Sequence, residues 1–263
     1  PGDPTSAYAY NPQLFYKNRG PRFYETIAYN GCTWPINGNK NYRLWTYYVG
    51  NTPVETKATS TGFYCRKAID PNLAVGDVQY AGTDWMEIRF AEVVLNLAES
   101  ACGINKLGEA YQGLEAIRKR AGIPAGADGL YGLQAGMSRS EMFKAILYER
   151  RIEFAFEGKR YWDMRRWKLF EGTLNDSVRT GITIDLDTAA ISASDFAAAR
   201  DTMNLDEAYS KYFTIQSKVL DTKYKIDWQP NYYFFAIPQQ SIDNNTKLLQ
   251  TKGWPGGTFD PLQ

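Results

Sequence analysis

Histidine is absent from the 263-residue chain. This side chain is the most frequent general base in enzymes, the usual activator of Ser and Cys nucleophiles, and a common ligand of catalytic zinc. Its absence excludes those classes of active site. Catalysis would have to rest on carboxylates, Lys or Tyr.

The chain also lacks an excess of charge of either sign, with 30 Lys and Arg against 29 Asp and Glu. A balance this even provides no long-range field that would attract phosphate polymers or anionic lipid. We therefore predict no nucleic-acid partner, and membrane-surface binding is disfavoured.

Cysteine is scarce: Cys32, Cys65 and Cys102 are widely spaced and form neither a zinc pattern nor a disulfide framework. One bridge is conceivable in an oxidising compartment, but buried free thiols are the favoured interpretation. The sequence has no apolar signal region and no spanning segment, and it begins at Pro1. We interpret it as a processed product or a fragment, so these absences do not locate the parent protein.

Aromatic residues, in contrast, are abundant, with 19 Tyr, 13 Phe and 7 Trp. Tyr and Trp pack their rings while their polar atoms stay hydrated, so a chain this rich in them is expected to expose some. Exposed rings can stack on the C–H faces of a pyranose, or they can form a protein interface. Composition alone leaves both open.

Three segments differ in character, and together they predict a mainly α-helical fold with long loops and a few short strands. Residues 1–83 are rich in loops and contain strand-like runs at 23–29, 43–49 and 62–69. Residues 84–170 form a helical core, and residues 171–263 form a variable region and a tail. In this last segment, residues 194–203 and 206–212 are candidate short helices, and residues 232–237 are a candidate strand.

The helical core is predicted to begin at Asp84, an N-cap with Glu87 three residues later. One apolar stripe then follows at helical spacing, made by Phe90, Val94, Leu97 and Ala101. A second helix over residues 108–121 completes a hairpin that is loosely similar to one tetratricopeptide unit.

A third helix is predicted to begin with a capping box, in which Ser138 is the N-cap and Glu141 lies three residues later. It is expected to run to Phe156 and to break at Gly158, with a short fourth helix over residues 160–170. Both helices lie in the most highly charged part of the chain.

Three carboxylates, Glu149, Glu153 and Glu157, recur every four residues and therefore line one helix face. They suggest a glycosidase, which needs an acid and a nucleophile or base. However, neighbours on one helix project side by side instead of flanking a substrate, and the interleaved arginines would lower their pKa values. A structural salt-bridge lattice is favoured, with the glycosidase as an alternative.

The same stretch resembles the helical signature of the SusD/RagB family, E-R-x-x-E-[LF]-A-x-E-G-x-R-x-x-D-x-x-R-W, with Phe154 in place of the usual Leu. The matching positions are Glu149, Arg150, Glu153, Ala155, Glu157, Gly158, Arg160, Asp163, Arg166 and Trp167. Residues 18–24 resemble the family's N-R-D-P-R-F-Y, although Gly20 replaces the Asp. Residues 89–99 resemble R-[YF]-A-E-x-x-L-N-x-A-E, and residues 245–254 resemble the closing N-P-x-L-x-Q-N-P-G-[YW], with departures at Thr246, Thr251 and Lys252.

This resemblance covers nearly the whole chain and corresponds to the C-terminal half of a SusD/RagB outer-membrane nutrient-binding lipoprotein. It implies a tetratricopeptide-like helical scaffold that is lipid-anchored at the outer-membrane surface through an N-terminal region absent from this chain. The implied partners are an oligosaccharide, a TonB-dependent (SusC-like) transporter and the N-terminal half of the parent protein. The implied function is non-catalytic capture of the glycan and its delivery to the transporter; a peptide-capturing or protein-interaction scaffold of the same fold is the alternative.

Residues of the family motifs are predicted to be scaffold, because their charges can pair between helices. The predicted ion-pair network consists of Arg89, Glu92, Glu99, Glu149, Arg150, Glu153, Glu157, Arg160, Asp163 and Arg166.

The glycan site is predicted in the loop-rich segment near the chain start, where rings alternate with amides. Its candidate residues are Trp34, Asn37, Asn39, Tyr42, Trp45 and Tyr47. Trp34, between a turn and a proline, favours a site. Trp45 and Tyr47 alternate as in a strand and could face the core; for Trp45 the two interpretations are evenly balanced. No cofactor is predicted, although Asp residues near positions 185–187, 221–227 and 243 could bind Ca²⁺.

Overall fold

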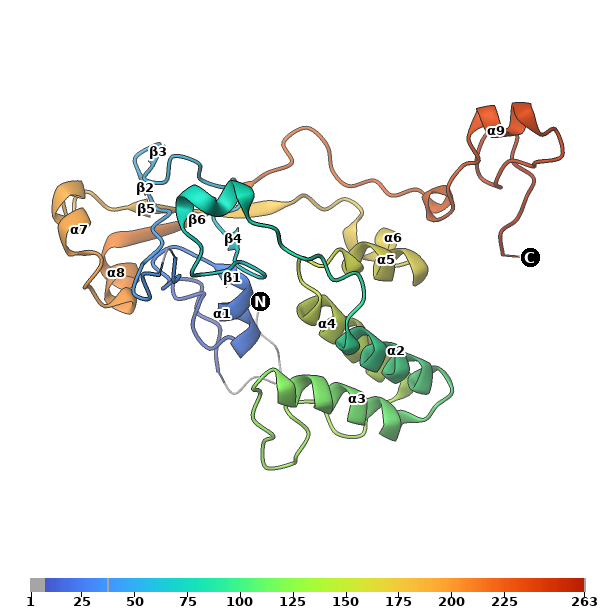
Figure 1. Cartoon of the computed structure of the whole chain (residues 1–263), viewed down its shortest axis with the longest axis horizontal. Helices are drawn as coiled ribbons and strands as arrows, with labels where there is room; N and C mark the ends of the chain where they lie inside the picture. Colours follow the sequence, from blue (N-terminus) through green and yellow to red (C-terminus); the bar gives the residue numbers. More distant parts are fainter. Residues whose placement is uncertain (1–7, 37, 263) are drawn as a thin grey trace. The chain divides into compact units, whose positions relative to one another are not determined.

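The computed structural model describes residues 8–36 and 38–262, and the chain is divided into two compact units. The first contains Pro1–Glu157 and Thr180–Leu220, and the second contains Gly158–Arg179 and Asp221–Gln263. Figure 1 colours both along the sequence. Because residues 180–220 return to the first unit, the two units cut across the three segments distinguished by sequence character.

Three helices pack together in the first unit: α2 (Phe90–Gly103), α3 (Leu107–Arg120) and α4 (Arg139–Glu153). A short turn, in which Asn105 has a φ of 62°, joins α2 to α3. A Cβ added to Gly113 of α3 would lie 2.9 Å from the Cβ of Ala98, so the glycine lets the two helices approach closely. Met142 and Ile146 of α4 are fully buried in the same core.

The start of α2 and its buried face both differ from the prediction. The helix begins at Phe90, and Asp84 lies outside it. Phe90 is 79% exposed and Leu97 is 64% exposed, whereas Leu95 and Ala98 are fully buried. Apolar side chains occupy two faces of this helix, so the periodicity of the sequence alone does not decide which face is buried. The face rich in Ala allows the closer approach of α3, and that face is buried.

The predicted capping box of α4 is present. The Oγ of Ser138 accepts a hydrogen bond from the Glu141 N–H at 3.4 Å, and Glu141 Oε2 accepts one from the Ser138 N–H at 2.8 Å. The helix ends at Glu153, before the predicted Phe156, which has a φ of 64°. Gly158, with a φ of 73°, precedes the next helix.

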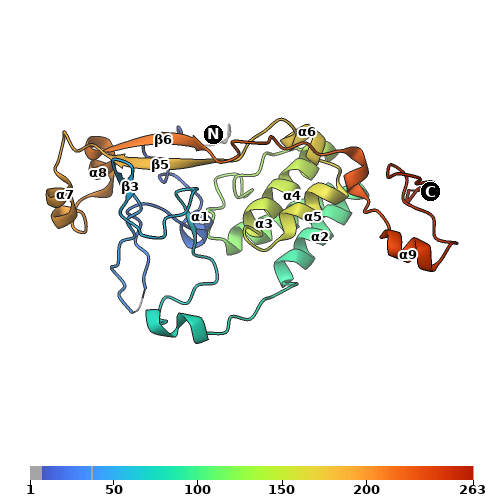
Figure 2. The same ribbon diagram turned by 90° about the horizontal axis from the view of Figure 1, so that it is seen from above.

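A four-stranded sheet forms the other part of the first unit. Its order is β3 (Thr52–Pro53), β2 (Tyr48–Val49), β5 (Thr180–Leu186) and β6 (Phe213–Val219). β5 and β6 pair antiparallel along their full length, and Figure 2 shows them as a long ribbon with α7 (Ala193–Ala199) and α8 (Leu205–Tyr212) at one end. The two helices are close to the predicted positions, but neither long strand was predicted.

The N-terminal segment contributes α1 (Pro21–Thr26), a small sheet of β1 (Ile27–Ala28) with β4 (Tyr64–Cys65), and η1 (Val75–Tyr80). Only two residues of each of the three predicted strand-like runs therefore form a strand. This segment and the β5–β6 region share an aromatic core. Phe15 packs edge-on against Tyr29 and Tyr209, and Tyr47 packs edge-on against Phe196. Residues 180–220 belong to the first unit because their rings complete this core.

The second unit contains α5 (Lys159–Arg166), α6 (Phe170–Leu174), η2 (Pro230–Tyr233) and α9 (Gln239–Asn244). Its small core includes Met164, Phe170 and Tyr233, and the Phe170 ring stacks on Trp228 at 3.8 Å. The predicted helix over residues 160–170 is present as α5 but ends at Arg166, and a second helix begins at Phe170. The predicted strand over 232–237 is wrong, because the chain there forms a 3-10 turn and then continues irregularly.

The fold as a whole is helical with some strands. All three cysteines are free thiols; Cys32 and Cys102 are buried and Cys65 is exposed. Within residues 8–36 and 38–262, no helix is long and apolar enough to cross a membrane.

Candidate functional site

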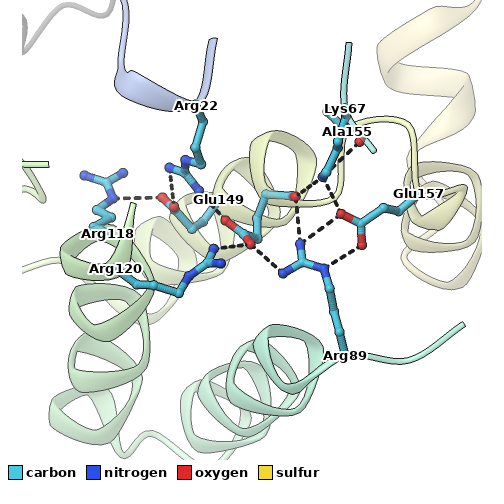
Figure 3. A network of polar contacts seen from close by, with 9 residues as sticks. Arg22, Lys67, Arg89, Arg118, Arg120, Glu149, Ala155 and Glu157 are labelled. Carbon is cyan, nitrogen blue, oxygen red and sulfur yellow. Dashed lines mark hydrogen bonds and ion pairs between the residues drawn. The ribbon is translucent and has the colours of Figure 1, made fainter. Parts of the chain in front are cut away.

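The C-terminal end of α4 and the turn that follows it present three carboxylates to a group of basic side chains, shown in Figure 3. Glu149 and Glu153 are 0% and 3% exposed. The guanidinium of Arg22 bridges them, lying 2.7 Å from Glu149 and 2.9 Å from Glu153. Arg118 of α3 donates from Nε to Glu149 at 2.8 Å. This end of α4 is therefore tied both to α3 and to α1, which flanks the aromatic core.

Arg89, just before α2, bridges Glu153 and Glu157. Its guanidinium lies 2.7 Å from Glu153 and 2.7 Å from Glu157. Arg120 pairs with Glu153, and Lys67 pairs with Glu157. Figure 3 shows that these side chains approach from separate segments of the chain.

The basic groups also cap the end of α4. The last carbonyls of a helix have no partner within it and carry the negative end of its dipole. Lys67 Nζ donates to the carbonyls of Glu153 at 2.9 Å and Ala155 at 3.2 Å, and Arg89 Nη2 donates to the Glu153 carbonyl at 2.9 Å. The same cations thus bind both side chains and backbone.

Electrostatics keep Glu153 and Glu157 ionised. Burial alone would raise the pKa of Glu153, but hydrogen bonds from Arg89 and Arg22 outweigh it and hold the pKa below its usual range. The pKa of Glu157 is lowered in the same way, with burial opposed by Arg89 and Lys67. A glycosidase needs one protonated carboxyl as its acid. Neither of these carboxylates is suited to that role.

Other predicted members of the network occupy related positions. Arg150 is buried, donates to Asn96 Oδ1 at 2.7 Å and lies 4.0 Å from Glu92. In the second unit, buried Asp163 pairs with Arg166 at 2.8 Å. The remaining two, Glu99 of α2 and Arg160 of α5, are half-buried.

Four basic residues of the network were missed by the sequence reasoning: Arg22, Lys67, Arg118 and Arg120. Only Arg22 carried a signal, because it lies in the family-like segment at residues 18–24.

Two of the predicted glycan-binding rings are core residues, which corrects the prediction for them. Trp45 is 6% exposed and Tyr47 is 1% exposed. The indole N–H of Trp45 donates to Asp201 Oδ1 at 2.7 Å, and the Tyr47 hydroxyl accepts from Arg200 at 3.0 Å. Their alternation directs both rings into the aromatic core, so neither has a free face on which a sugar could stack.

Trp34, Asn39 and Tyr42 lie on a hairpin-like loop, residues 33–43, hereafter the aromatic loop. Thr33 and Arg43 form an antiparallel bridge at its base, and the Trp34 N–H donates to the Tyr42 carbonyl at 2.9 Å. Trp34 is half-buried, while Tyr42 is 41% exposed. Trp34 and Tyr42 therefore face each other across the two arms of one loop.

One predicted amide, that of Asn39, lies near the tip of the aromatic loop. Asn39 is exposed, and its Oδ1 accepts from the Asn41 N–H at 3.0 Å, which leaves its NH₂ group facing solvent. Asn37, also predicted, lies outside the described residues. Tyr64 of β4 was not predicted; its ring is 6.5 Å from that of Trp34.

Basic side chains fix the base of the aromatic loop. Arg43 donates from Nη1 to the carbonyls of Arg200 at 3.0 Å and Met203 at 2.7 Å. Arg66 donates to the Thr33 carbonyl at 3.1 Å. A loop held at its base can present its tip with little conformational freedom to lose on binding.

Comparison with known proteins identifies the family, because the model of the SusD family matches residues 2–254. The chain belongs to the SusD family. It is 34% identical over 98 residues to SusD-like protein P2 of Formosa agariphila, a match that covers 37% of this chain and 19% of that protein.

Two solved structures from Bacteroides fragilis are similar. One is a SusD-like protein, at 24% identity and a TM-score of 0.64, over 91% of this chain and 40% of the other. The second is described as a SusD-like carbohydrate binding protein, at 25% identity and a TM-score of 0.56, over 92% of this chain and 43% of the other. The chain thus spans less than half the length of these relatives.

The ion-pair network at the end of α4 is built from segments that resemble SusD family motifs. Three of the four segments that resemble family motifs contain Arg22, Arg89, Glu149, Glu153 and Glu157. Here those segments meet at the end of α4 and hold it against its neighbours. In this SusD-family chain these five charged residues therefore act as scaffold residues.

Two of the carboxylates considered for Ca²⁺ have other partners. Asp221 pairs with Arg179 at 2.6 Å, and Asp243 accepts from Gln239 at 2.8 Å. Among the residues that the structure describes, no group of three or more His, Cys, Asp or Glu is arranged to hold a metal ion.

Proposed function

We propose that this chain is part of a non-catalytic oligosaccharide-binding protein. The observation that carries the proposal is membership of the SusD family together with likeness to a relative described as a carbohydrate binding protein. The paired Glu149, Glu153 and Glu157 support the non-catalytic part, because their arginine partners occupy the atoms that an acid or nucleophile would need free.

The aromatic loop is the proposed contact surface for the glycan. Trp34 and Tyr42 offer apolar ring faces for the C–H faces of a pyranose, and the Asn39 amide can donate to a sugar hydroxyl. Tyr64 extends the ring surface beside Trp34. Trp45 and Tyr47 act indirectly, by fixing the strand that follows the loop.

We also propose that the protein works at the bacterial outer-membrane surface, lipid-anchored through a region outside this chain, and delivers its glycan to a TonB-dependent transporter. In this proposal α2, α3 and α4 belong to a tetratricopeptide-like scaffold. The α2–α3 hairpin, with its close crossing at Gly113, supports the helical part.

The test is a panel of soluble polysaccharides measured by affinity electrophoresis, with the full-length gene product that contains this chain. Trp34→Ala and Tyr42→Ala are compared with the wild type and with Tyr224→Ala. Tyr224 is 81% exposed and lies in the second unit, so it is a matched control for loss of an exposed ring.

Removing a ring that stacks on the ligand is expected to cost about 1–2 kcal/mol, or roughly 5- to 30-fold in Kd. The control variant should bind like the wild type. Unchanged binding in both loop variants would move the site elsewhere without altering the family. Retention of peptides and of no glycan would favour the peptide-capturing alternative.

A further inference from the structure

Positive charge gathers around the aromatic loop, although the chain as a whole is close to neutral. Between Thr26 and Arg66 the sequence has four basic residues and one acidic residue, Glu55. The basic residues are Lys40, Arg43, Lys57 and Arg66. In the network at the end of α4, by contrast, each basic side chain faces a carboxylate. The loop region therefore carries a local excess of cations that the network does not neutralise.

Arg66 is held beside the two rings that the loop and β4 bring together. It lies two residues after Tyr64, and its N–H continues the β1–β4 pairing by donating to the Thr26 carbonyl at 3.0 Å. Side chains two residues apart in extended chain project from the same face. The guanidinium also donates to the carbonyl of Thr33, the residue before Trp34, at 3.1 Å. Two separate contacts thus keep the charge of Arg66 next to the Trp34–Tyr64 ring pair.

The guanidinium of Arg66 has further donors to offer. A guanidinium carries several N–H donors in a planar fork, and the one hydrogen bond that it makes to Thr33 comes from Nη1. The side chain is half-buried, and Arg66 makes no ion pair among the residues that the structure describes. Carboxylates and tetrahedral oxyanions accept two parallel hydrogen bonds from such a fork. Arg66 is therefore suited to an acidic group.

Lys40 and Arg43, the charges of the loop itself, differ in their accessibility. Lys40 lies near the tip, is exposed and makes no ion pair within residues 8–36 and 38–262. Arg43, at the base, donates to the backbone carbonyls of Gly31, Arg200 and Met203. Arg43 therefore fixes the loop, whereas Lys40 can attract an anionic chain.

Two carboxylates, Glu55 and Asp70, lie in the same part of the chain. Burial raises the pKa of Tyr64, and the charge of Glu55 adds to that rise. Asp70 accepts a hydrogen bond from a backbone N–H of its own turn at 2.9 Å. At the base of the loop the sign is the opposite: burial raises the pKa of the Cys32 thiol, while the charges of the two arginines lower it. Against four basic residues, two carboxylates leave the region positive.

We propose that the aromatic loop takes an acidic glycan, one that bears carboxylate or sulfate groups, and that Arg66 binds the acidic group. The inference rests on the proposed function of the loop and names the class of sugar. The rings of Trp34 and Tyr64 stack on the pyranose, and the guanidinium beside them receives the carboxylate or sulfate. An acidic sugar gains a charge-assisted, two-point contact that a neutral sugar lacks.

Affinity electrophoresis of the full-length gene product tests the proposal with matched pairs of polymers. One pair is polygalacturonate and its carboxyl-reduced form, and the other is carrageenan and its desulfated form; starch is a further neutral polymer. The mobility of each variant is compared with its own mobility in a gel without polysaccharide. The variants are Arg66→Gln, Arg66→Lys and Lys223→Gln. Lys223 is an exposed lysine of the second unit, so it is the control for loss of a surface charge.

The wild type should bind one acidic polymer about tenfold or more tightly than its neutral form, and which polymer it binds separates carboxylate from sulfate recognition. Arg66→Gln should weaken that binding about tenfold, because the two-point contact is lost. Arg66→Lys should weaken it less, because the charge is kept. Lys223→Gln should bind like the wild type.

Retardation by neutral polymers alone would overturn the proposal, and if it still depended on Trp34 the proposed function would stand. An Arg66 that only holds the Thr33 backbone would give equal losses on the acidic and neutral forms of one polymer, and this result would also overturn the proposal. Retardation by no polymer in either pair, or by starch, would overturn the acidic-glycan inference together with the proposed function.

Discussion

Replacing Glu153 with Gln is expected to destabilise the first unit severely. The side chain is 3% exposed and faces three guanidiniums, those of Arg22, Arg89 and Arg120. Arg22 and Arg89 are themselves 17% and 19% exposed, whereas Arg120 is 56% exposed and can return to water. Gln keeps the shape but removes the charge, and it sets an NH₂ donor beside other donors.

Breaking a buried ion pair by removing one partner costs about 3–5 kcal/mol, because the other charge stays buried. Only the two poorly exposed arginines contribute in full here, and Arg22 keeps Glu149 while Arg89 keeps Glu157. The expected loss in the free energy of unfolding is therefore at the lower end of that range, about 3 kcal/mol. It is a large part of the stability of an ordinary domain.

Urea unfolding followed by helical circular dichroism measures this effect. A loss of about 3 kcal/mol corresponds to a midpoint roughly 1–3 M lower, for slopes of the size usual in urea. The matched control is Glu207→Gln, which removes the surface pair with Lys211 at 2.7 Å and should leave the midpoint unchanged.

Equal midpoints for Glu153→Gln and the control would refute the account of the network as a clamp on α4. A lower midpoint together with a changed slope would show that the unfolding transition itself had changed, and the free-energy difference would then need a second probe.

Two further predictions concern pH and thiols. The pKa values of Glu153 and Glu157 are lower in the folded chain than their ordinary value of 4.5, so the folded state binds fewer protons than the unfolded state. The stability that the two carboxylates supply should be complete above that pH and fall as the pH drops below it. This fall should be shallower in Glu153→Gln. A thiol reagent should modify only Cys65 in the native chain, because Cys32 and Cys102 are buried and burial raises their pKa values. In urea it should modify all three cysteines. Labelling of Cys102 in the native chain would contradict the packing of α2.

Capping residues and helical periodicity in the sequence predicted two of the helices correctly. Ser138 and Glu141 fixed the start of α4, and the periodicity around Leu114 fixed α3. The buried face of α2 was chosen wrongly because two faces are apolar, and only the close approach of Gly113 to Ala98 decides between them. That contact joins two helices and is not encoded in either alone.

Long-range pairing accounts for the missed strands. Ile182, Ile184 and Leu186 alternate along β5, a period-two signal that was present in the sequence. Its partner β6 lies beyond two helices, so no turn marker connects the strands. The same alternation placed Trp45 and Tyr47 in the core, where composition had made them look like ligand contacts.

The candidate site was predicted only in part, for the same reason. The ring content and loop position of Trp34 and Tyr42 were visible in the sequence, but Tyr64 comes from a distant strand. The network showed the opposite pattern. Its carboxylates were evident from their four-residue spacing, although Glu157 lies beyond the end of α4 and not on its face. Three of its basic partners had no signal because they come from other segments.

The central claim is that the aromatic loop binds a glycan without cleaving it. The most direct measurement is calorimetric titration of one retained oligosaccharide into the full-length gene product, followed by chromatography of the sugar from the same cell. The account predicts saturable binding, at least fivefold weaker in Trp34→Ala than in Tyr224→Ala, with the oligosaccharide recovered intact. Shortened products, or equal affinity in the two variants, would contradict it.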